Sequence, residues 1–469
     1  MKPFPHAIFR AYDIRGKVSV LTPELVCAIA QALAEQFLTA QITRIVIGYD
    51  ARLSSPSYAQ IIQQTCIEMG VDAELMGCCS SPMLYFAARQ FQGCGIMVTA
   101  SHNAKCDNGI KWLCQGEPAT PEMIQQIAQR AEAFYQQPPK FELTEFDSIH
   151  QLPALYSTEY QTALLQDIKI PKNLKVVLDG MHGSAGIYAA QVLQSLGCQV
   201  ITLRCEPNGH FPDHAPDPSQ EKHLTQLQAM ILEQQAQVGI ALDGDGDRLV
   251  LLDEQAQVIR ADRLMALFAA MTLQQKPQHE VVFDVKCSSL VRQTIEQQQG
   301  IPVMIRTGSS FLRRYLAQSK GRAIFGGEYA GHYVFNDGRG FGYDDGLYAA
   351  LRVLEYLAAC KQPLSVLMQD YPATYGTEDL YLPTYDLDAQ AVLAHVREQS
   401  QQFSGKLSEI DGIRLDFEDG FGIIRASNTG EFFTLRFDAQ SEMRLQQIRQ
   451  LFIAMLAPYP TLARDLAQA

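Results

Sequence analysis

The sequence lacks the long apolar segments of a secreted or membrane protein. Its start, MKPFPHAIFRAYDIRG, has no apolar run of signal-peptide length, and the clearest apolar stretch, residues 264–273, is too short to span a bilayer. The 11 cysteines form no C-x-x-C pair and no disulfide framework, which is typical of a reducing compartment. We therefore expect a cytoplasmic protein that does not act on a membrane.

Positive charge is also scarce. The formal net charge of −13 argues against a nucleic-acid partner, which would need a basic face to neutralise phosphates. A small anionic substrate remains open, because an acidic protein can still gather cations in one cleft. The 469 residues, 47% of them hydrophobic, exceed what one core supports and favour three or four domains.

Three segments of the chain resemble one another. Each has a short β-branched run, an aspartate, a polar loop with small residues and a helix-compatible stretch. Because the apolar runs do not alternate, they suit strands buried on both faces, as in repeated βαβ units. The sequence therefore predicts three tandem related α/β domains. The segments are RIVIGYDARLSSP (residues 44–56), LKVVLDGMHGSAG (174–186) and HEVVFDVKCSSLV (279–291).

Changes in composition set the expected domain boundaries. A Gln/Pro-rich stretch closes the first domain, and the last hundred residues alternate helical and strand-like segments, which is typical of a separate α+β domain. Helices are expected at 156–167, 389–402 and 441–456, and strands at 412–417, 422–426 and 432–437. The expected domains are 1–153, 154–257, 258–372 and 373–469.

The segment GIMVTASHNAKCDNGIKW, residues 95–112, places Ser101 at the tip of an expected strand. A nucleophile, a helix cap or a turn residue would all suit that position. A serine hydrolase is disfavoured, because the chain has no G-x-S-x-G elbow and His102 cannot act as base merely by being adjacent. His102 orients the loop, contacts an anion or is purely structural.

The strongest local signal is GIALDGDGDRLVLLDE, residues 239–254. Asp243, Asp245 and Asp247 alternate with glycines, a spacing that lets three carboxylates converge on one hard divalent cation. A calcium EF-hand is the competing interpretation, but Arg248 stands where its turn requires Gly and the flanks are strand-like. Arg248 beside the carboxylates indicates an anion near the cation.

Two further loops carry polar side chains between apolar runs. In FGGEYAGHYVF, Glu328 and His332 are able to bind sugar hydroxyls or move a proton, although an ordinary turn explains them too. IIRASNTGEFFTLRF is typical of a phosphate-binding turn, with a polar hairpin as the alternative. Its candidate residues are Arg425, Ser427, Asn428 and Thr429. Isolated candidates for anion contacts are Tyr12, Arg15, Lys111 and Lys286.

Taken together, the motifs FRAYDIRG, TASHN, DGDGDR, GGEYAGH and RASNT resemble the α-D-phosphohexomutase family, most closely its phosphomannomutase/phosphoglucomutase branch. The likeness extends from residue 9 to residue 437. It implies three mixed α/β domains and a C-terminal domain around a central cleft. The domains would carry, in order, the phosphoserine, metal-binding, sugar-binding and phosphate-binding loops.

The resemblance also implies a reaction, the interconversion of hexose 6-phosphate and hexose 1-phosphate on mannose or glucose. Ser101 is similar to the family's phosphoryl carrier and, with Asp243, Asp245 and Asp247, to its Mg²⁺ ligands. A hexose 1,6-bisphosphate serves as intermediate and activator. Lys111, Arg15 and His332 would assist catalysis, and His102 and Asn103 would support the loop. Substrate contacts would come from Tyr12, Arg248, Lys286, Glu328, His332, Arg425, Ser427, Asn428 and Thr429.

Three positions depart from the family pattern. Ala104 replaces a proline, Ala330 replaces a serine in the sugar loop, and Glu431 adds negative charge beside the phosphate loop. These departures keep open a phosphosugar-binding protein with impaired turnover. A phosphoglucosamine mutase is the closest enzymatic alternative, although RASNT favours the hexose branch. A calcium-binding module rests on residues 243–254 alone.

Overall fold

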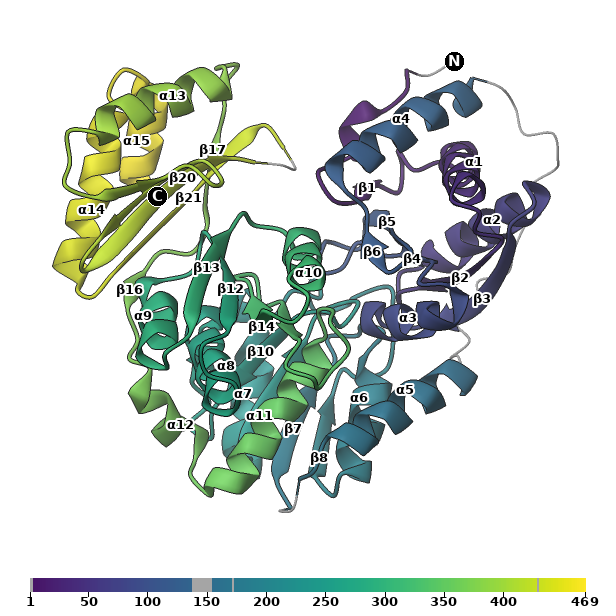
Figure 1. Ribbon diagram of the computed structural model, residues 1–469, viewed down its shortest axis with the longest axis horizontal. Helices are drawn as coiled ribbons and strands as arrows, with labels where there is room; N and C mark the ends of the chain where they lie inside the picture. The colour runs from purple at the N-terminus through teal and green to yellow at the C-terminus, as the bar shows by residue number, and fades with distance from the viewer. Residues whose placement is uncertain (1–2, 137–153, 171–172, 428–429) are drawn as a thin grey trace. The chain divides into compact units, whose positions relative to one another are not determined.

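The computed structural model describes residues 3–136, 154–170, 173–427 and 430–469 (Figure 1). The chain forms two compact units by its internal contacts. The first unit consists of Met1–Arg260 and Ala330–Leu367, and the second of Ala261–Tyr329 and Met368–Ala469.

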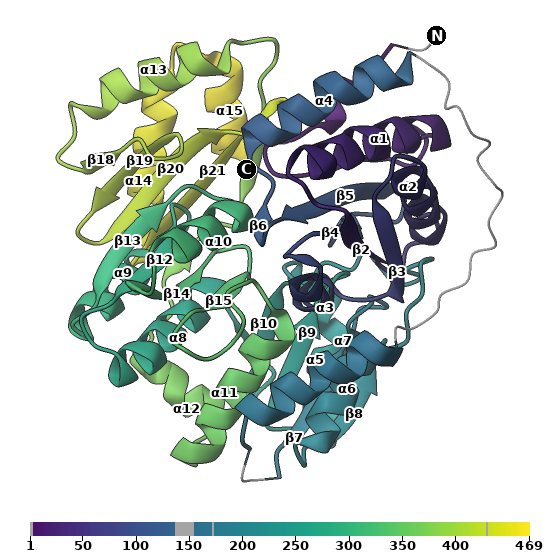
Figure 2. The same ribbon diagram turned by 45° about the vertical axis from the view of Figure 1, so that its right-hand side comes forward.

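The first unit opens with a mixed sheet of strand order β1-β5-β4-β2-β3, with β6 beside β5. β2 is parallel to β3 and β4, whereas β5 runs antiparallel to β4 and β1. Figure 2 shows α1, α2 and α4 on one face of this sheet and α3 on the other. The strands are β1 (Ile14–Lys17), β2 (Arg44–Tyr49), β3 (Asp72–Cys78), β4 (Gly95–Val98), β5 (Asp107–Cys114) and β6 (Glu117–Pro118). The helices are α1 (Pro23–Thr39), α2 (Ser55–Glu68), α3 (Ser81–Ala88) and α4 (Pro121–Tyr135).

Local sequence explains where these helices begin. The side chains of Thr22, Ser80 and Thr120 each accept a backbone N–H from the first turn of α1, α3 and α4, and a proline follows within two residues. A hydroxyl cap satisfies an otherwise unpaired donor, and proline already has the helical φ angle. The apolar runs of β2 and β4 are buried, as expected for strands covered on both faces.

The second sheet of the first unit has the order β11-β10-β9-β7-β8. β7 is parallel to β8 and β9, and β10 is antiparallel to β9 and β11. The DGDGDR segment is therefore the turn between the antiparallel strands β9 and β10. The strands are β7 (Lys175–Asp179), β8 (Gln199–Leu203), β9 (Val238–Leu242), β10 (Leu249–Leu252) and β11 (Val258–Ile259). The short strand β15 (Tyr333–Phe335) belongs to the first unit but not to this sheet. The helices are α5 (Ala154–Asp167), α6 (Gly186–Ser195), α7 (Thr225–Gln234), α11 (Gly346–Cys360) and α12 (Leu364–Leu367).

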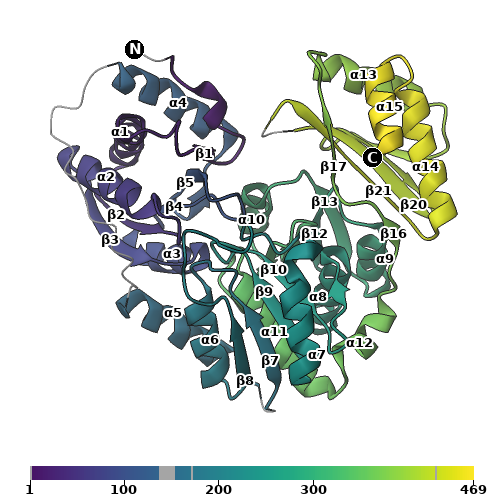
Figure 3. The same ribbon diagram turned by 180° about the vertical axis from the view of Figure 1, so that it is seen from behind.

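In the second unit, β12 lies between the parallel strands β13 and β14. Figures 1 and 3 show α8 and α9 on one face of these strands and α10 on the other. The strands are β12 (Glu280–Asp284), β13 (Ile301–Ile305) and β14 (Ala323–Gly327), and the helices are α8 (Ala261–Gln275), α9 (Ser289–Gln297) and α10 (Ser309–Gln318).

The end of the chain forms an antiparallel sheet of order β16-β21-β20-β19-β18, with β17 also beside β21. Helix α14 packs on β20 and β21 around a phenylalanine-rich core. The strands are β16 (Tyr375–Gly376), β17 (Leu380–Pro383), β18 (Lys406–Ser408), β19 (Ile413–Phe417), β20 (Gly420–Ala426) and β21 (Phe432–Ala439). The helices are α13 (Ala389–Ser400), α14 (Glu442–Met455) and α15 (Pro460–Gln468).

These elements confirm the α/β interpretation of the sequence. The three similar segments fold as β2 followed by α2, β7 followed by α6, and β12 followed by α9. The helices and strands expected after residue 388 are present within a few residues of their expected bounds. In the described part of the chain, every helix is too short or too polar to cross a bilayer.

Candidate active site

Ser101 lies in the loop between β4 and β5, where it is 1% exposed. Its φ of 51° is in the left-handed region, an uncommon conformation for a residue other than glycine. Its backbone N–H donates to the Thr99 hydroxyl at 2.8 Å, and its own hydroxyl donates to Asp243 at 2.7 Å. The loop therefore holds the serine hydroxyl against the first aspartate of the DGDGDR turn.

Asp243, Asp245 and Asp247 are buried, and one oxygen from each lies within 4.8 Å of the others. The serine loop approaches this turn closely, because a Cβ at Gly244 would come within 2.5 Å of the Ser101 carbonyl oxygen. Only glycine leaves room for that approach. The sequence-based expectation that the three carboxylates converge is thus met by the structure.

Lys111, on β5, supplies the nearest positive charge. Its Nζ donates at 3.0 Å to a carboxylate oxygen of Asp245 and at 3.0 Å to one of Asp247. Burial alone would lower the pKa of Lys111, but these two carboxylates raise it well above its usual value. The amine therefore remains an ammonium cation at neutral pH.

The outer two aspartates differ in their protonation behaviour. Burial and repulsion from the other two carboxylates raise the pKa of Asp243 well above its usual value. Burial would also raise the pKa of Asp247, but Lys111, His332 and Arg248 together lower it well below its usual value. A negative charge on Asp243 is therefore unfavourable in this turn, and a bound cation would stabilise it.

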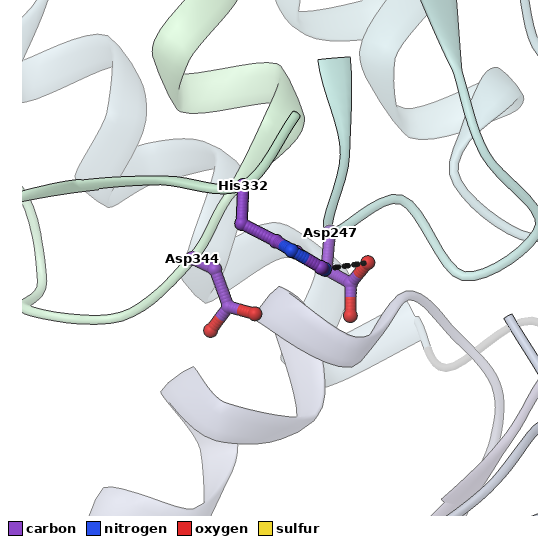
Figure 4. Close-up of side chains that lie close together, drawn as sticks. All are labelled: Asp247, His332 and Asp344. Atoms are coloured by element: carbon purple, nitrogen blue, oxygen red, sulfur yellow. Dashed lines mark ion pairs between the residues drawn. The ribbon is translucent and has the colours of Figure 1, made fainter. Parts of the chain in front are cut away.

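His332 reaches the same cluster from the segment just before β15. Its Nε2 lies 3.3 Å from Asp247 Oδ1 and 3.3 Å from Arg248 Nε (Figure 4). A protonated Nε2 donates to Asp247, whereas an unprotonated Nε2 accepts from Arg248. His332 Nε2 therefore has a hydrogen-bond partner both when it carries a proton and when it does not.

Asp344 is a buried residue of this cluster that the sequence interpretation missed. Its carboxylate lies within 4.8 Å of ligand atoms of Asp247 and His332, and Figure 4 shows it beside the imidazole. The only available signal was the DD pair before α11, which reads as a helix cap. Asp345 does have that role, because its side chain accepts the Tyr348 N–H.

Arg15 and Asn103 form a second layer around the serine loop. Arg15 is 8% exposed; it donates to the Asn103 side chain at 3.0 Å and to Asp13 at 2.5 Å. Burial, and then the cations Arg248 and Arg15, lower the pKa of His102 well below its usual value, so the imidazole ring is neutral. Its Nδ1 lies 3.2 Å from the Ser101 hydroxyl oxygen. Tyr12 is half-buried just before β1.

The donor set around the aspartates fits a hard divalent cation. Mg²⁺ and Ca²⁺ take oxygen ligands, and oxygens sharing one Mg²⁺ lie roughly 3–4 Å apart. Asp245 Oδ1 is buried and accepts no hydrogen bond from any described residue. Such an unpartnered carboxylate oxygen is costly unless a cation or water reaches it. The residues present therefore fit a hard divalent cation with oxygen ligands.

Arg52 holds the serine loop from behind and was also missed. Its fully buried guanidinium donates to the carbonyls of Ala104 and Asp107 at 2.7 and 3.0 Å, and to those of Ser101 and Asn103 at 2.7 and 2.8 Å. Because four carbonyls accept from one planar guanidinium group, the backbone path of the whole loop is fixed. This clamp also holds the loop at Ala104, where the family's proline is absent.

Asp50 anchors the Arg52 guanidinium. It accepts from Arg52 Nε at 3.0 Å, from the Thr99 hydroxyl at 2.7 Å and from the Ser55 hydroxyl at 2.6 Å. Because Thr99 in turn accepts the Ser101 N–H, one hydrogen-bonded chain runs from the end of β2 to the serine. The aspartate after the strand was noted in the sequence, but a buried arginine two residues later is not expected from residue type.

The second unit holds the other sequence candidates. Lys286 donates to Asp379 at 2.6 Å. Burial alone would lower the pKa of Lys286, but the negative charge of Asp379 raises it above its usual value. Glu328 is 1% exposed and accepts the Gly308 N–H at 2.5 Å. Both side chains are thus fixed within the second unit.

The arginine of the RASNT loop is paired as well. Arg425, at the end of β20, contacts Asp411 at 3.0 Å, and the Ser427 N–H donates to the Phe432 carbonyl at 2.9 Å. Asn428 and Thr429 lie outside the described residues. Glu431 is exposed, which places its charge in solvent. Ala330, in the first unit, is half-buried.

Fold and site together define an α/β protein with a buried serine at the tip of a strand, opposite three converging carboxylates and a paired lysine. Models of the phosphoglucomutase/phosphomannomutase family match this chain in three consecutive α/β/α domains. Domain I matches residues 6–137, domain II residues 156–256 and domain III residues 260–375. The chain belongs to the phosphoglucomutase/phosphomannomutase family.

Individual relatives resemble the chain over nearly its full length. A phosphomannomutase/phosphoglucomutase from Pseudomonas aeruginosa is 35% identical, covering 96% of this chain and 95% of its own. A phosphoglucomutase from Neisseria meningitidis is 36% identical, covering 97% and 98%. A crystal structure of a phosphoglucomutase/phosphomannomutase family protein from Burkholderia thailandensis is 31% identical, with a TM-score of 0.87 over 97% of this chain and 98% of that one.

Proposed function

We propose that this protein is a phosphomannomutase/phosphoglucomutase, which interconverts hexose 6-phosphate and hexose 1-phosphate on mannose or glucose. The observation that carries the proposal is the hydrogen bond from the Ser101 hydroxyl to Asp243, within a cluster that Lys111 completes. The full-length relatives named above support the same reaction. The relative named as a probable phosphoglucosamine mutase is more distant, at 32% identity over 429 residues.

In this proposal Ser101 is the phosphoryl carrier. A phosphoryl group on its Oγ passes to one sugar hydroxyl, which loses its proton, and the product is a hexose 1,6-bisphosphate. After the bisphosphate turns round, its other phosphoryl group returns to Oγ and leaves the isomeric monophosphate. The numbers of phosphoryl groups on enzyme and sugar are therefore restored at the end of each cycle.

Asp243, Asp245 and Asp247, with the phosphorylated Ser101, would hold Mg²⁺. When bound, the ion stabilises negative charge on the transferred phosphoryl group. Lys111 stays positive and contributes charge stabilisation, since its raised pKa makes it a poor base at neutral pH.

The proton from the sugar hydroxyl needs a nearby acceptor, and His332 is the strongest candidate. Its Nε2 lies 3.3 Å from a carboxylate oxygen of Asp247 and 3.3 Å from Arg248 Nε, so the nitrogen has a partner whether or not it carries a proton. We assign Arg15 to a phosphate contact rather than to proton transfer, because an arginine remains charged in proteins. His102 and Asn103 support the loop.

We assign the remaining candidates to substrate binding. Tyr12 and Arg248 in the first unit, and Lys286, Glu328, Arg425 and Ser427 in the second, are proposed to contact sugar hydroxyls or phosphate, as are Asn428 and Thr429. The free thiol state of all 11 cysteines supports a reducing compartment, and we propose the cytoplasm.

Replacing Ser101 with alanine tests the reaction. We expect Ser101→Ala to lose on the order of 10³-fold or more in kcat, because the nucleophile is removed. The assay follows conversion of mannose 1-phosphate and glucose 1-phosphate with Mg²⁺ and a catalytic amount of glucose 1,6-bisphosphate. Ser57→Ala, at a half-buried position of α2, is the matched control and should keep full activity. Undiminished turnover in Ser101→Ala would exclude the proposal, and saturable binding without product in the wild type would indicate a binding protein.

A further inference from the structure

Cys94 and Cys114 face each other across two neighbouring strands. Gly95 pairs with Leu113 in the antiparallel register of β4 and β5, so the next pair outward is Cys94 with Cys114. The neighbouring Cys114 thiol lowers the pKa of Cys94, and the Cys94 thiol raises the pKa of Cys114. Both cysteines are reduced in this structure.

The type of strand pair favours a cross-link. Thr99 N–H donates to the Gly109 carbonyl, which makes that a hydrogen-bonded pair. Because hydrogen-bonded and non-hydrogen-bonded pairs alternate, the Cys94–Cys114 pair, five steps away, is a non-hydrogen-bonded one. Cα atoms in such pairs lie about 4.5 Å apart, within the range of about 4.4–6.8 Å that a disulfide spans.

Two tight turns hold the pair in register. Gly93 precedes Cys94, Gly116 follows Cys114 by two residues, and both glycines have positive φ angles of 75° and 82°. The Gly116 N–H donates to the Gly93 carbonyl at 2.8 Å, and a Cβ at Gly93 would lie 2.3 Å from the Gly116 nitrogen. Only glycine permits this approach, so the strand ends are fixed with the two cysteines opposed.

The chemical surroundings of the two sulfurs differ. Cys94 is buried; its sulfur accepts the Gln115 N–H at 3.2 Å, and its S–H donates to the Gln92 carbonyl at 3.7 Å. The neighbouring Cys114 thiol, outweighing burial, lowers the pKa of Cys94 to about 7. By contrast, burial raises the pKa of Cys66 to about 12 and that of Cys198 to about 11. Cys114 is only half-buried, at the start of an exposed turn.

We propose that Cys94 and Cys114 are a peroxide-sensitive modification site, which closes reversibly to an intrachain disulfide. The Cys94 thiolate attacks one oxygen of hydrogen peroxide, forming a sulfenic acid, and the leaving hydroxide takes a proton to become water. The Cys114 sulfur then attacks the Cys94 sulfur, loses its proton and expels the hydroxyl group as a second water. Two thiols are oxidised and one peroxide is reduced, and a dithiol reductant reverses the change.

The cross-link would enclose the Ser101 loop within a closed segment of the chain. Closing such a segment restricts the unfolded state, so we expect the Tm of the oxidised protein to rise by several degrees. Trp112, the single tryptophan of the chain, lies two residues before Cys114 and pairs with Ile96. Because side chains at i and i+2 share a face, the disulfide lies beside the indole, and we expect quenched emission.

Peptide mapping provides the direct test, since trypsin separates the three cysteines of this region. Cleavage after Arg89, Lys105, Lys111 and Arg130 places Cys94 in peptide 90–105, Cys106 in 106–111 and Cys114 in 112–130. The whole chain is treated with hydrogen peroxide, quenched with catalase, alkylated and digested without reductant. We expect peptides 90–105 and 112–130 to be linked, lighter by two hydrogen atoms than their sum and separable by dithiothreitol.

Matched variants complete the experiment. Cys106→Ser removes the exposed neighbouring thiol and should leave the cross-link, the Tm rise and the quenching unchanged. Cys114→Ser should abolish all three, and Cys94→Ser provides the same test from the other side if either variant folds poorly. Recovery of both cysteines as alkylated thiols when Cys106 is fully oxidised would overturn the proposal. Irreversible oxidation of Cys94 without a link would overturn it as well.

Discussion

Ser101 combines an uncommon backbone conformation with a buried, hydrogen-bonded hydroxyl. Its backbone is in the left-handed region and its hydroxyl is buried against a carboxylate. Strained residues of this kind persist where the surrounding structure over-determines them, and they cluster at functional sites. Here the conformation of Ser101 is held by the Thr99 hydroxyl and the Arg52 guanidinium, and Gly244 lets the aspartate turn approach closely.

The aspartate turn makes a sharp prediction for one residue. Asp245→Asn keeps the acceptor for the Ser81 hydroxyl and Lys111 but removes a negative oxygen from the proposed cation site. We expect the Mg²⁺ concentration for half-maximal activity to rise about 10–100-fold, as measured by titration of metal-stripped enzyme.

The control for Asp245→Asn is Asp72→Asn, which removes one carboxylate from the exposed edge strand β3. It should leave the Mg²⁺ requirement unchanged, because surface charges interact weakly with a site at a distance. An Asp245→Asn enzyme with an unaltered Mg²⁺ requirement would mean that the three aspartates are not the ligand set.

At the scale of elements, the loop between β4 and β5 depends on Arg52, which lies in the segment between β2 and α2. Arg52→Lys keeps the positive charge beside Asp50 but cannot reach four carbonyls at once. We expect kcat to fall about 10²-fold, since displacement of a reacting group by about 1 Å has that effect. The measurement is the rate of phosphate transfer from glucose 1,6-bisphosphate to Ser101, alongside steady-state kcat and KM.

Arg44→Lys, at the exposed start of β2, is the matched control and should leave both rates within a factor of about two. A purely structural role for Arg52 predicts lower thermal stability with normal phosphate transfer in the folded fraction. That outcome would contradict the role assigned to the clamp.

The cap of helix α11 predicts a pH dependence of stability. Burial raises the pKa of Asp345 from its ordinary value of 3.8 to about 7. Between pH 4 and pH 7 the folded chain keeps a proton on Asp345 that the unfolded chain has released. The contribution of Asp345 to the free energy of unfolding is therefore full below pH 4 and is lost as the pH rises through 7. Asp345→Asn mimics the protonated form and removes this dependence.

We therefore expect the free energy of unfolding of the wild type to fall by roughly 3 kcal/mol relative to Asp345→Asn between pH 5 and pH 8. Urea unfolding at each pH gives the comparison, and Asp72→Asn again serves as the control for loss of one carboxylate. Parallel pH profiles for wild type and Asp345→Asn would show that the buried carboxyl titrates normally.

The whole molecule shows which parts of the account a sequence can predict. The α/β units and the segments around β2, β7 and β12 follow from short apolar runs and polar loops, because a strand buried on both faces has that local signature. The convergence of three aspartates in one turn is likewise local. The boundaries at 153, 257 and 372 stay predictions.

What the sequence interpretation missed depends on contacts between distant segments. Arg52 lies 49 positions from Ser101, and Ser81 lies 164 positions from Asp245, yet each pair is hydrogen-bonded. Asp344 joins the His332 cluster only through folding of the chain after β15. No local pattern marks Arg52 or Ser81 as part of a site, because residue type alone predicts exposure for arginine and serine.

The most direct test of the account is the mass of the freshly purified chain, followed by phosphate mapping after trypsin. Peptide 90–105 contains only two hydroxyl side chains, Thr99 and Ser101, so fragmentation assigns the site without ambiguity. We predict one phosphate on Ser101, or its appearance there on incubation with glucose 1,6-bisphosphate and Mg²⁺, and none in Ser101→Ala. A chain that stays unphosphorylated at Ser101 under both conditions while turning over substrate would contradict the central claim.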